Sequence, residues 1–245
     1  MNRLYVAGKT DIGRIRNENQ DNFKIELFEN QAALAIVCDG MGGAVFGREA
    51  SEIAAKAIYD RISASFRLDM GNNSLRNLLL TSVNAANSLV YKKSEVSSEK
   101  NGMGTTCVVA IVRDNICFIA SAGDSRAYII DNNGITQVTN DHTYVSMLLK
   151  QGKITKEEIK QHKMRNVITK AIGTERDVDV DYFEVDLKPE SYVLLCSDGL
   201  TNYCSDELIH DYVTNKEINE SAEDLIKYVN THGGKDNITI AIIKN

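Results

Sequence analysis

The sequence predicts an α+β domain in which antiparallel strands and helices form separate layers. Solid apolar runs bounded by Gly, Asp or Asn indicate buried strands. Two turn signals, Asp114-Asn115 and residues 131–134, join neighbouring runs, and such short connections produce antiparallel hairpins. Two long segments with the i, i+3, i+4 apolar spacing of helices follow one another along the chain. Antiparallel strands combined with helix pairs form layered α+β domains.

The strands are predicted from two kinds of pattern. Phe23, Ile25 and Leu27 alternate with polar residues, which indicates a half-buried strand. Ile238, Ile240 and Ile242 alternate in the same way near residue 245. Uninterrupted apolar runs predict strands buried on both faces at Ala32–Cys38, Cys107–Val112, Ile116–Ala122 and Tyr192–Cys196.

Three longer helices and a polar segment with short helices complete the prediction. The first helix follows the apolar spacing from Ala50 to Ile62, and the second runs from Leu75 to Val90 after a start at Asn73 or Ser74. The third begins at Ser221, has Asp224 three residues later and ends at Gly233-Gly234. The polar stretch between Asp141 and Gly173 contains two short helical pieces, one starting at Thr155 with Glu158 as its capping-box partner.

Composition excludes several classes of protein. The chain has 245 residues, 43% of them apolar, which favours a folded globular protein over a disordered one. The net charge of −6 disfavours general nucleic-acid binding and attachment to an acidic membrane. The longest apolar run has seven residues, so no membrane-spanning segment is predicted. No signal-peptide core and no linker are recognised, so we expect one domain covering residues 1–245.

Cysteine usage indicates a reducing compartment. The five cysteines form no Cys-x-x-Cys pair, and four of them, Cys38, Cys107, Cys117 and Cys196, lie inside apolar runs. We therefore expect buried free thiols and a cytoplasmic protein.

Aspartates follow or precede many of the predicted strands. They are Asp21, Asp39, Asp124, Asp198 and Asp236, most of them beside glycine. A single Asp-Gly after a strand usually forms a turn. Five such sites could meet at one edge of a sheet, and carboxylates gathered there need cations to remain charged. Carboxylates, carbonyls and water favour hard divalent ions such as Mg²⁺ or Mn²⁺.

The sequence lacks the residue patterns of zinc sites, serine hydrolases and common nucleotide-binding proteins. Four histidines are present and none has zinc-ligand spacing with another His or Cys. The chain has no Gly-x-Ser-x-Gly elbow, no Walker A loop and no Gly-x-Gly-x-x-Gly motif.

The chain resembles the metal-dependent serine/threonine protein phosphatases of the 2C type, in their small bacterial form. The resemblance extends from Tyr5 to Ile243. It rests on eight motifs that occur in the family's order: Gly13-Arg14-Ile15-Arg16 leading to Asn19-Gln20-Asp21-Asn22; Val37-Cys38-Asp39-Gly40-Met41-Gly42-Gly43; Gly104-Thr105-Thr106; Gly123-Asp124-Ser125-Arg126; Asp141-His142-Thr143; Asn166-Val167-Ile168-Thr169; Cys196-Ser197-Asp198-Gly199-Leu200; and Gly234-Lys235-Asp236-Asn237-Ile238-Thr239.

The resemblance implies a four-layer sandwich of two antiparallel sheets flanked by pairs of antiparallel helices. It also implies a centre of two Mn²⁺ or Mg²⁺ ions at one edge, with a weaker third ion. Asp39 would bridge both ions, and Asp198 and Asp236 would complete the first. The Gly40 carbonyl would serve the second ion, which Asp21 would support.

The same resemblance assigns the remaining site residues. Arg16 would grip the substrate phosphate, which suits its planar fork. Asp124 would share the third ion with Asp198, and residues from 143 to about 170 would form a flap beside the cleft. Met41 stands where many eukaryotic members have a histidine proposed as general acid, which leaves the acid unassigned. A metal-bound water could serve as the acid. His142 is another candidate, although a packing or flap role is the alternative interpretation of this histidine.

The implied reaction is hydrolysis of phosphoserine or phosphothreonine esters by direct attack of a water that bridges the two metal ions. The expected partners are phosphorylated proteins and a cognate serine/threonine kinase, with no nucleic acid and no membrane, and the chain is expected to be a monomer. Two alternatives remain open on the same fold. One is a phosphoprotein-binding pseudophosphatase without metals, and the other is a hydrolase of small phosphorylated metabolites.

Overall fold

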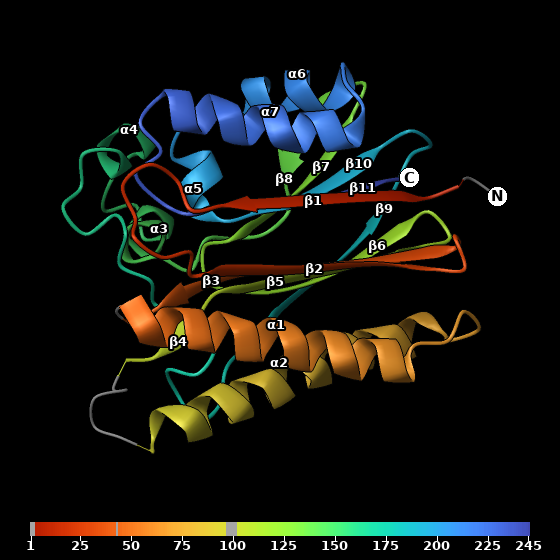
Figure 1. The fold of residues 1–245 in the computed structure, drawn as a ribbon, viewed down its shortest axis with the longest axis horizontal. Helices are drawn as coiled ribbons and strands as arrows, with labels where there is room; N and C mark the ends of the chain where they lie inside the picture. Colours follow the sequence, from red (N-terminus) through yellow and green to blue (C-terminus); the bar gives the residue numbers. More distant parts are fainter. Residues whose placement is uncertain (1–2, 43, 97–101) are drawn as a thin grey trace.

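A computed structural model describes residues 3–42, 44–96 and 102–245; Gly43 of the Asp39–Gly43 motif lies outside the described residues. Two antiparallel sheets pack face to face, and helices cover both outer faces (Figure 1). The first sheet has the strand order β1-β11-β10-β7-β8. The second has the order β2-β3-β5-β6-β9, with β4 beside β3.

The strands of the first sheet are β1 (Tyr5–Asp11), β7 (Arg126–Asp131), β8 (Gly134–Gln137), β10 (Tyr192–Cys196) and β11 (Ile238–Lys244). Those of the second are β2 (Asp21–Phe28), β3 (Ala32–Met41), β4 (Gly104–Thr105), β5 (Cys107–Arg113), β6 (Ile116–Ala122) and β9 (Asp181–Asp186). The described helices are α1 (Ala44–Ser65), α2 (Asn72–Ser94), α3 (Tyr144–Lys150), α4 (Lys156–Ile159), α5 (Asp198–Thr201), α6 (Asp206–Thr214) and α7 (Ile218–Thr231).

Three apolar cores separate the four layers, which confirms the predicted sandwich. One core joins α1 and α2 to the second sheet through side chains such as Ile36, Ile58 and Leu79. Another joins α6 and α7 to the first sheet. The third lies between the sheets, where Val37 and Ala241 are fully buried. Strands β3, β5 and β10 contribute to two cores each, which explains the uninterrupted apolar runs predicted for them.

The predicted strands and hairpins are confirmed. The β5–β6 turn places Asp114 and Asn115 at φ values of 53° and 58°, the left-handed conformation that a two-residue hairpin requires. The β7–β8 turn uses Gly134 at φ 137°. The capping box at Thr155 and Glu158 is also present.

Several boundaries and elements differ from the prediction. The second helix starts after Gly71 and not at Asn73 or Ser74. The helix expected at Ser221 starts at Ile218, and the Ser221 hydroxyl instead donates to backbone carbonyls of Tyr212 and Glu217. Strands β1 and β9 and helices α5 and α6 were not predicted. Both of these strands lie at sheet edges and are half exposed, which leaves a weak apolar pattern.

The antiparallel order brings the strand termini that carry aspartates to one end of the sandwich. Strands β2 and β11 begin at this end, whereas β3, β6 and β10 finish there. The loop between β1 and β2 and helices α3 to α5 surround the same end (Figure 1). No described helix is long and apolar enough to cross a bilayer.

Candidate metal centre

Asp39 and Asp21 face one another across the β2–β3 pair. The backbone of Asp39 is fixed by β4 and β5, because its N–H donates to the Thr106 hydroxyl at 2.9 Å. Its carbonyl accepts from the Thr106 N–H and the Thr105 hydroxyl, each at 2.8 Å. Asp39 lies two residues before the end of β3, so its carboxylate is held by a regular sheet and not by a mobile loop.

Asp21 connects the two sheets. Ser197, which follows β10, donates its hydroxyl to Asp21 Oδ2 at 2.7 Å and accepts the Thr239 N–H at 3.0 Å. The Asp21 residue is only 4% exposed. Its Oδ1 atom is buried and has no hydrogen-bond partner among the described residues. A buried carboxylate oxygen without a partner is energetically costly unless a proton or a cation compensates it.

Asp198 and Asp236 come from the first sheet. Asp198 is the first residue of α5, directly after β10, and its Oδ2 accepts from Asn202 Nδ2 at 3.1 Å. Asp236 precedes β11, and its Oδ2 accepts from Arg16 Nη2 at 2.8 Å. Burial raises the pKa of Asp198, and the two carboxylates are close enough that the charge of Asp236 raises it further. The predicted phosphate-binding arginine therefore lies beside a predicted ligand.

Asp124 is placed by a turn that only glycine adopts easily. Gly123 has φ +114°, and a Cβ atom there would lie 2.6 Å from Thr106 Cβ. His142 holds this turn from both sides, since its N–H donates to the Gly123 carbonyl and its Nδ1 accepts the Gly123 N–H, each at 3.0 Å. Asp124 thus follows a rigid turn against β5.

The five aspartates form one electrostatic cluster. Burial, followed by the charges of the other four, raises the pKa of Asp39 well above its usual value. Burial also raises the pKa of Asp21 to about 7, with Asp198 and Asp236 adding to the effect. The pKa of Asp124 is raised to about 7 by burial and by the charges of Asp198 and Asp141. Carboxylates under this mutual repulsion favour binding of cations.

The oxygen donors of this cluster are of the kind that hard divalent ions prefer. No group of three or more described His, Cys, Asp or Glu side chains is already placed to hold an ion. Mg²⁺ retains several waters in its sites and is bound through one or two carboxylates, so it does not require a dense cage of protein ligands. The unpartnered Asp21 Oδ1 and the all-oxygen donor set support the fit.

Gly40 lies where α1 passes closest to β3. A Cβ atom at Gly40 would lie 2.0 Å from the Gly47 carbonyl oxygen, and one at Gly47 would lie 2.8 Å from the Gly40 carbonyl oxygen. Both positions therefore require glycine for the helix to approach. Gly47 was not singled out in the sequence, because its role depends on a contact between two elements.

We expect the metal-free protein to lose stability as the pH rises from about 4 to about 7. The folded state raises the pKa values of Asp21 and Asp124 from 3.8 to about 7. It therefore binds protons more tightly than the unfolded chain, and this stabilisation is complete below pH 3.8 and lost as the pH passes 7. In chelator, the Tm measured by circular dichroism should be lower at pH 8 than at pH 5, and D21N/D124N should flatten the difference. An equal or higher Tm at pH 8 would contradict the assignment.

His142 has no ring nitrogen available for proton transfer to substrate. Because Nδ1 accepts the Gly123 N–H, the proton of the neutral ring lies on Nε2, which is 3.2 Å from Asp181 Oδ2. Burial lowers the pKa of His142, so the neutral form is favoured. The structure therefore favours the packing role for His142 over that of general acid.

Asn237 was not assigned a role from the sequence, yet it holds the loop that carries Arg16. Its side chain is buried and its Oδ1 accepts from the Gln20 N–H at 2.8 Å. Its Nδ2 donates to the carbonyls of Ile12 and Glu18 at 2.9 and 3.0 Å. Its position next to Asp236 was the only sequence signal for this role.

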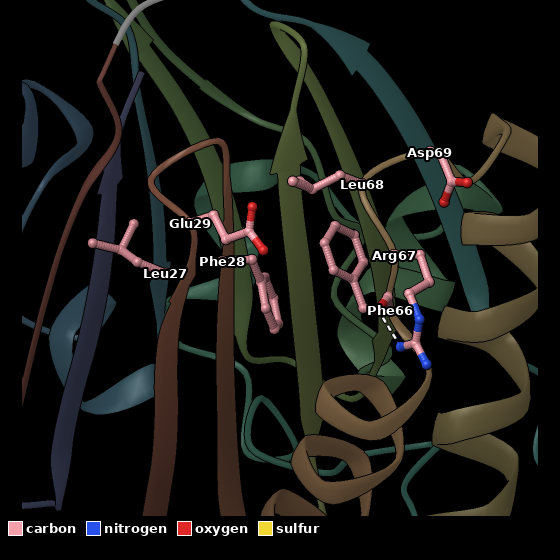
Figure 2. A pocket seen from close by; sticks show the side chains of 7 residues that line it. All are labelled: Leu27, Phe28, Glu29, Phe66, Arg67, Leu68 and Asp69. Atoms are coloured by element: carbon pink, nitrogen blue, oxygen red, sulfur yellow. Dashed lines mark hydrogen bonds between the residues drawn. The ribbon is translucent and has the colours of Figure 1, made fainter.

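A cavity of about 450 Å³ lies away from the acidic cluster (Figure 2). It is lined by Leu27 and Phe28 at the end of β2, by Glu29 of the following turn and by residues 66–69 after α1. The rings of Phe28 and Phe66 stack with centroids 4.4 Å apart, and Arg67 donates to the Phe66 carbonyl. Asp21 and Phe28 are the two ends of β2, so this cavity is separated from the aspartates by the length of the strand.

The architecture is that of solved bacterial serine/threonine phosphatases. The structure of Stp1 from Staphylococcus aureus matches with a TM-score of 0.92 and 34% identity, covering 100% of this chain and 96% of that one. The catalytic domain of the phosphatase PstP, solved with two manganese ions, matches with a TM-score of 0.86 and 30% identity, covering 99% and 98%.

Sequence comparison leads to the same class. The serine/threonine phosphatase stp of Listeria welshimeri is 36% identical over 242 residues, which cover 98% of this chain and 96% of that protein. The Protein phosphatase 2C family model matches residues 14–240. The chain belongs to the protein phosphatase 2C family, whose members are metal-dependent phosphatases.

Proposed function

We propose that this protein hydrolyses phosphoserine and phosphothreonine esters in proteins by direct attack of water at a centre of two Mn²⁺ or Mg²⁺ ions. One observation carries the proposal. In the fold of this family, Asp39 lies in a regular strand, and its pKa is raised by burial and by the charges of four other aspartates close to it. Such a concentration of carboxylates is useful where cations are bound.

The family resemblance assigns the ligands. Asp39 would contact both ions, Asp198 and Asp236 would complete the first, and the Gly40 carbonyl would contact the second. Asp21 would support the second ion from its buried position between the sheets. Asp124 and Asp198 would hold a weaker third ion, and the proximity of their charges supports a shared site.

Bound divalent ions would supply an acidified water as the nucleophile and positive charge for the phosphoryl oxygens. The chain's own residues orient the substrate. One guanidinium nitrogen of Arg16 contacts Asp236, while the side chain is 49% exposed and can still reach a phosphate. Asn237 holds the backbone on both sides of Arg16, so this arginine is positioned from the same segment as Asp236.

We propose that a solvent molecule provides the proton for the leaving alkoxide. Met41 has no acidic proton, and both ring nitrogens of His142 are engaged by Gly123 and Asp181. The five cysteines are buried and free. Burial raises the pKa of the Cys117 and Cys196 thiols, which makes them poor nucleophiles.

A comparison of substrates tests this proposal against its alternatives. With Mn²⁺, we expect kcat/KM on a phosphothreonine peptide to exceed that on sugar phosphates and nucleoside monophosphates by about 100-fold, because the residues that flank the phosphothreonine add binding energy to that of the phosphate itself. Phosphate release from each substrate is measured at equal enzyme concentration. A preference for a sugar or nucleoside phosphate would support the metabolite hydrolase. Tight phosphopeptide binding without turnover would support the pseudophosphatase.

The cellular setting is part of the proposal. We propose a monomeric cytoplasmic enzyme with one catalytic domain over residues 1–245, which acts against a serine/threonine kinase. Buried free cysteines support a reducing compartment. Residues 143–170 would form a flap, since the β-bridge between Thr143 and Ile168 brings the two ends of this segment together.

A further inference from the structure

Residues 143–170 concentrate positive charge in an acidic protein. This segment has seven Lys and Arg residues and two Glu residues, for a net charge of +5 in a chain whose total is −6. Six of the seven cations are exposed: Lys150, Lys153, Lys156, Lys160, Lys163 and Arg165. Within the described chain, the ion pairs of this segment involve only the seventh, Lys170, which contacts Asp179 and Asp181. The six exposed cations, called here the basic surface, remain available to an external anion.

The basic surface is anchored beside the candidate metal centre. The backbone N–H groups of Tyr144 and Thr169 donate to the carbonyls of Val167 and His142, each at 2.8 Å, so both ends of the segment meet. His142 in turn contacts Gly123, the residue before Asp124. Helices α3 and α4 lie at the same end of the sandwich as the loop between β1 and β2 (Figure 1). A ligand bound to the basic surface therefore extends toward the catalytic edge.

The electrostatics of this edge give the basic surface a use. A phosphorylated residue must approach a cluster of five aspartates. If bound metal ions do not neutralise all of this negative charge, the cluster also repels acidic residues that flank the phosphorylated one. Exposed lysines attract such residues over roughly 8 Å at physiological ionic strength. Lysines without an internal partner lose no ion pair when they bind an anion.

We propose that the basic surface docks acidic residues that flank the phosphorylated residue of a protein substrate. This inference rests on the proposed phosphatase function and specifies its substrate class. Anionic lipid and nucleic acid present similar charge. The attachment of the segment next to Asp124 favours the substrate itself, because only a ligand that enters the catalytic edge gains from a docking surface there.

The test uses two phosphothreonine peptides that differ only at four flanking positions, Glu in one and Gln in the other. We expect the full-length enzyme with saturating Mn²⁺ to prefer the Glu peptide by about tenfold in kcat/KM at 50 mM NaCl, and the preference to shrink at 500 mM NaCl. In K153Q/K156Q/K160Q the preference should fall to about one. The matched control R61Q/K92Q/K227Q removes three exposed positive charges on α1, α2 and α7 and should keep the tenfold preference.

Rates are normalised to each variant's own rate on p-nitrophenyl phosphate, which reports the chemistry and the integrity of the fold. Equal rates on the two peptides with wild-type enzyme, or a preference that survives in K153Q/K156Q/K160Q, would overturn the inference. Lysine-dependent binding to phosphatidylserine vesicles or duplex DNA without a peptide preference would also overturn it. Absence of hydrolysis of both peptides and of p-nitrophenyl phosphate would instead refute the proposed function.

Discussion

Asp39→Asn should lower kcat on a phosphothreonine peptide by about 10³-fold or more, the scale of losses seen when a group that stabilises the transition state is removed. The substitution keeps the shape of the side chain and removes the charge proposed to serve both ions. The backbone contacts of Asp39 with Thr105 and Thr106 do not involve the carboxylate, so the strand should remain intact.

The same substitution should lower activity without lowering the thermal stability of the protein in chelator. Because burial and the charges of four other aspartates raise the pKa of Asp39, removing this ionisable group relieves both desolvation and repulsion, and the Tm in chelator should be unchanged or higher. The stabilisation that Mn²⁺ gives to the wild type should be largely lost. A simple folding defect would instead lower both the activity and the Tm in chelator.

Asp186→Asn provides the matched control for Asp39→Asn. Asp186 is exposed and ends β9, opposite Ile116 and away from the acidic edge. Its replacement should keep kcat within about twofold of wild type. The Mn²⁺-dependent rise in Tm should stay within about one or two degrees of wild type, as is usual for surface positions. Near-normal turnover in Asp39→Asn would remove Asp39 from the centre of the mechanism.

Removal of divalent ions should abolish activity, and Mn²⁺ or Mg²⁺ should restore it. The five cysteines are buried and both ring nitrogens of His142 have hydrogen-bond partners, so neither residue type is placed to act as a nucleophile in place of water. The measurement is phosphate release in excess EDTA, followed by titration with Mn²⁺. Ca²⁺ offers a comparison, because its longer bonds and higher ligand number suit this chemistry less well.

Metal binding has a second readout that does not depend on catalysis. An ion that binds only the folded state at 100 times its Kd should stabilise it by about 2.7 kcal/mol. This rise in the free energy of unfolding should be larger at pH 8 than at pH 5, because protons compete for Asp21 and Asp124 at the lower pH. Full activity in excess EDTA, or no stabilisation by Mn²⁺ at pH 8, would exclude the proposed centre.

The local elements with strong patterns could be predicted from the sequence. Apolar runs such as Ala32–Cys38 predict strands buried on both faces, because such strands exclude polar residues. The Asp114-Asn115 hairpin is equally local, since both residues tolerate the left-handed backbone that they adopt. Elements at the surface were harder to predict from the sequence. Strands β1 and β9 are paired on one side only, and their half-exposed residues carry little periodicity.

The residues of the candidate site could be found in the sequence, whereas most of the contacts between them could not. Aspartates at strand ends were visible in the sequence, and the family resemblance assigned their roles. Which of them meet depended on the stacking of two sheets, because Asp21 and Ser197 are 176 residues apart and touch only when β2 and β10 lie in facing sheets. The same is true of Asn237, whose contacts with Ile12, Glu18 and Gln20 cross more than 200 residues.

The sequence alone is sufficient to predict the strongly apolar strands, the long helices, the candidate acidic residues and the family. The tertiary structure sets how the charges act on one another. A carboxylate in an isolated strand has an ordinary pKa, whereas burial between packed layers and four neighbouring aspartates raise the pKa of Asp39. The tertiary structure also determines the role of His142, because the partners of its two ring nitrogens come from different elements. Both properties depend on distances through space, which separation along the chain does not specify.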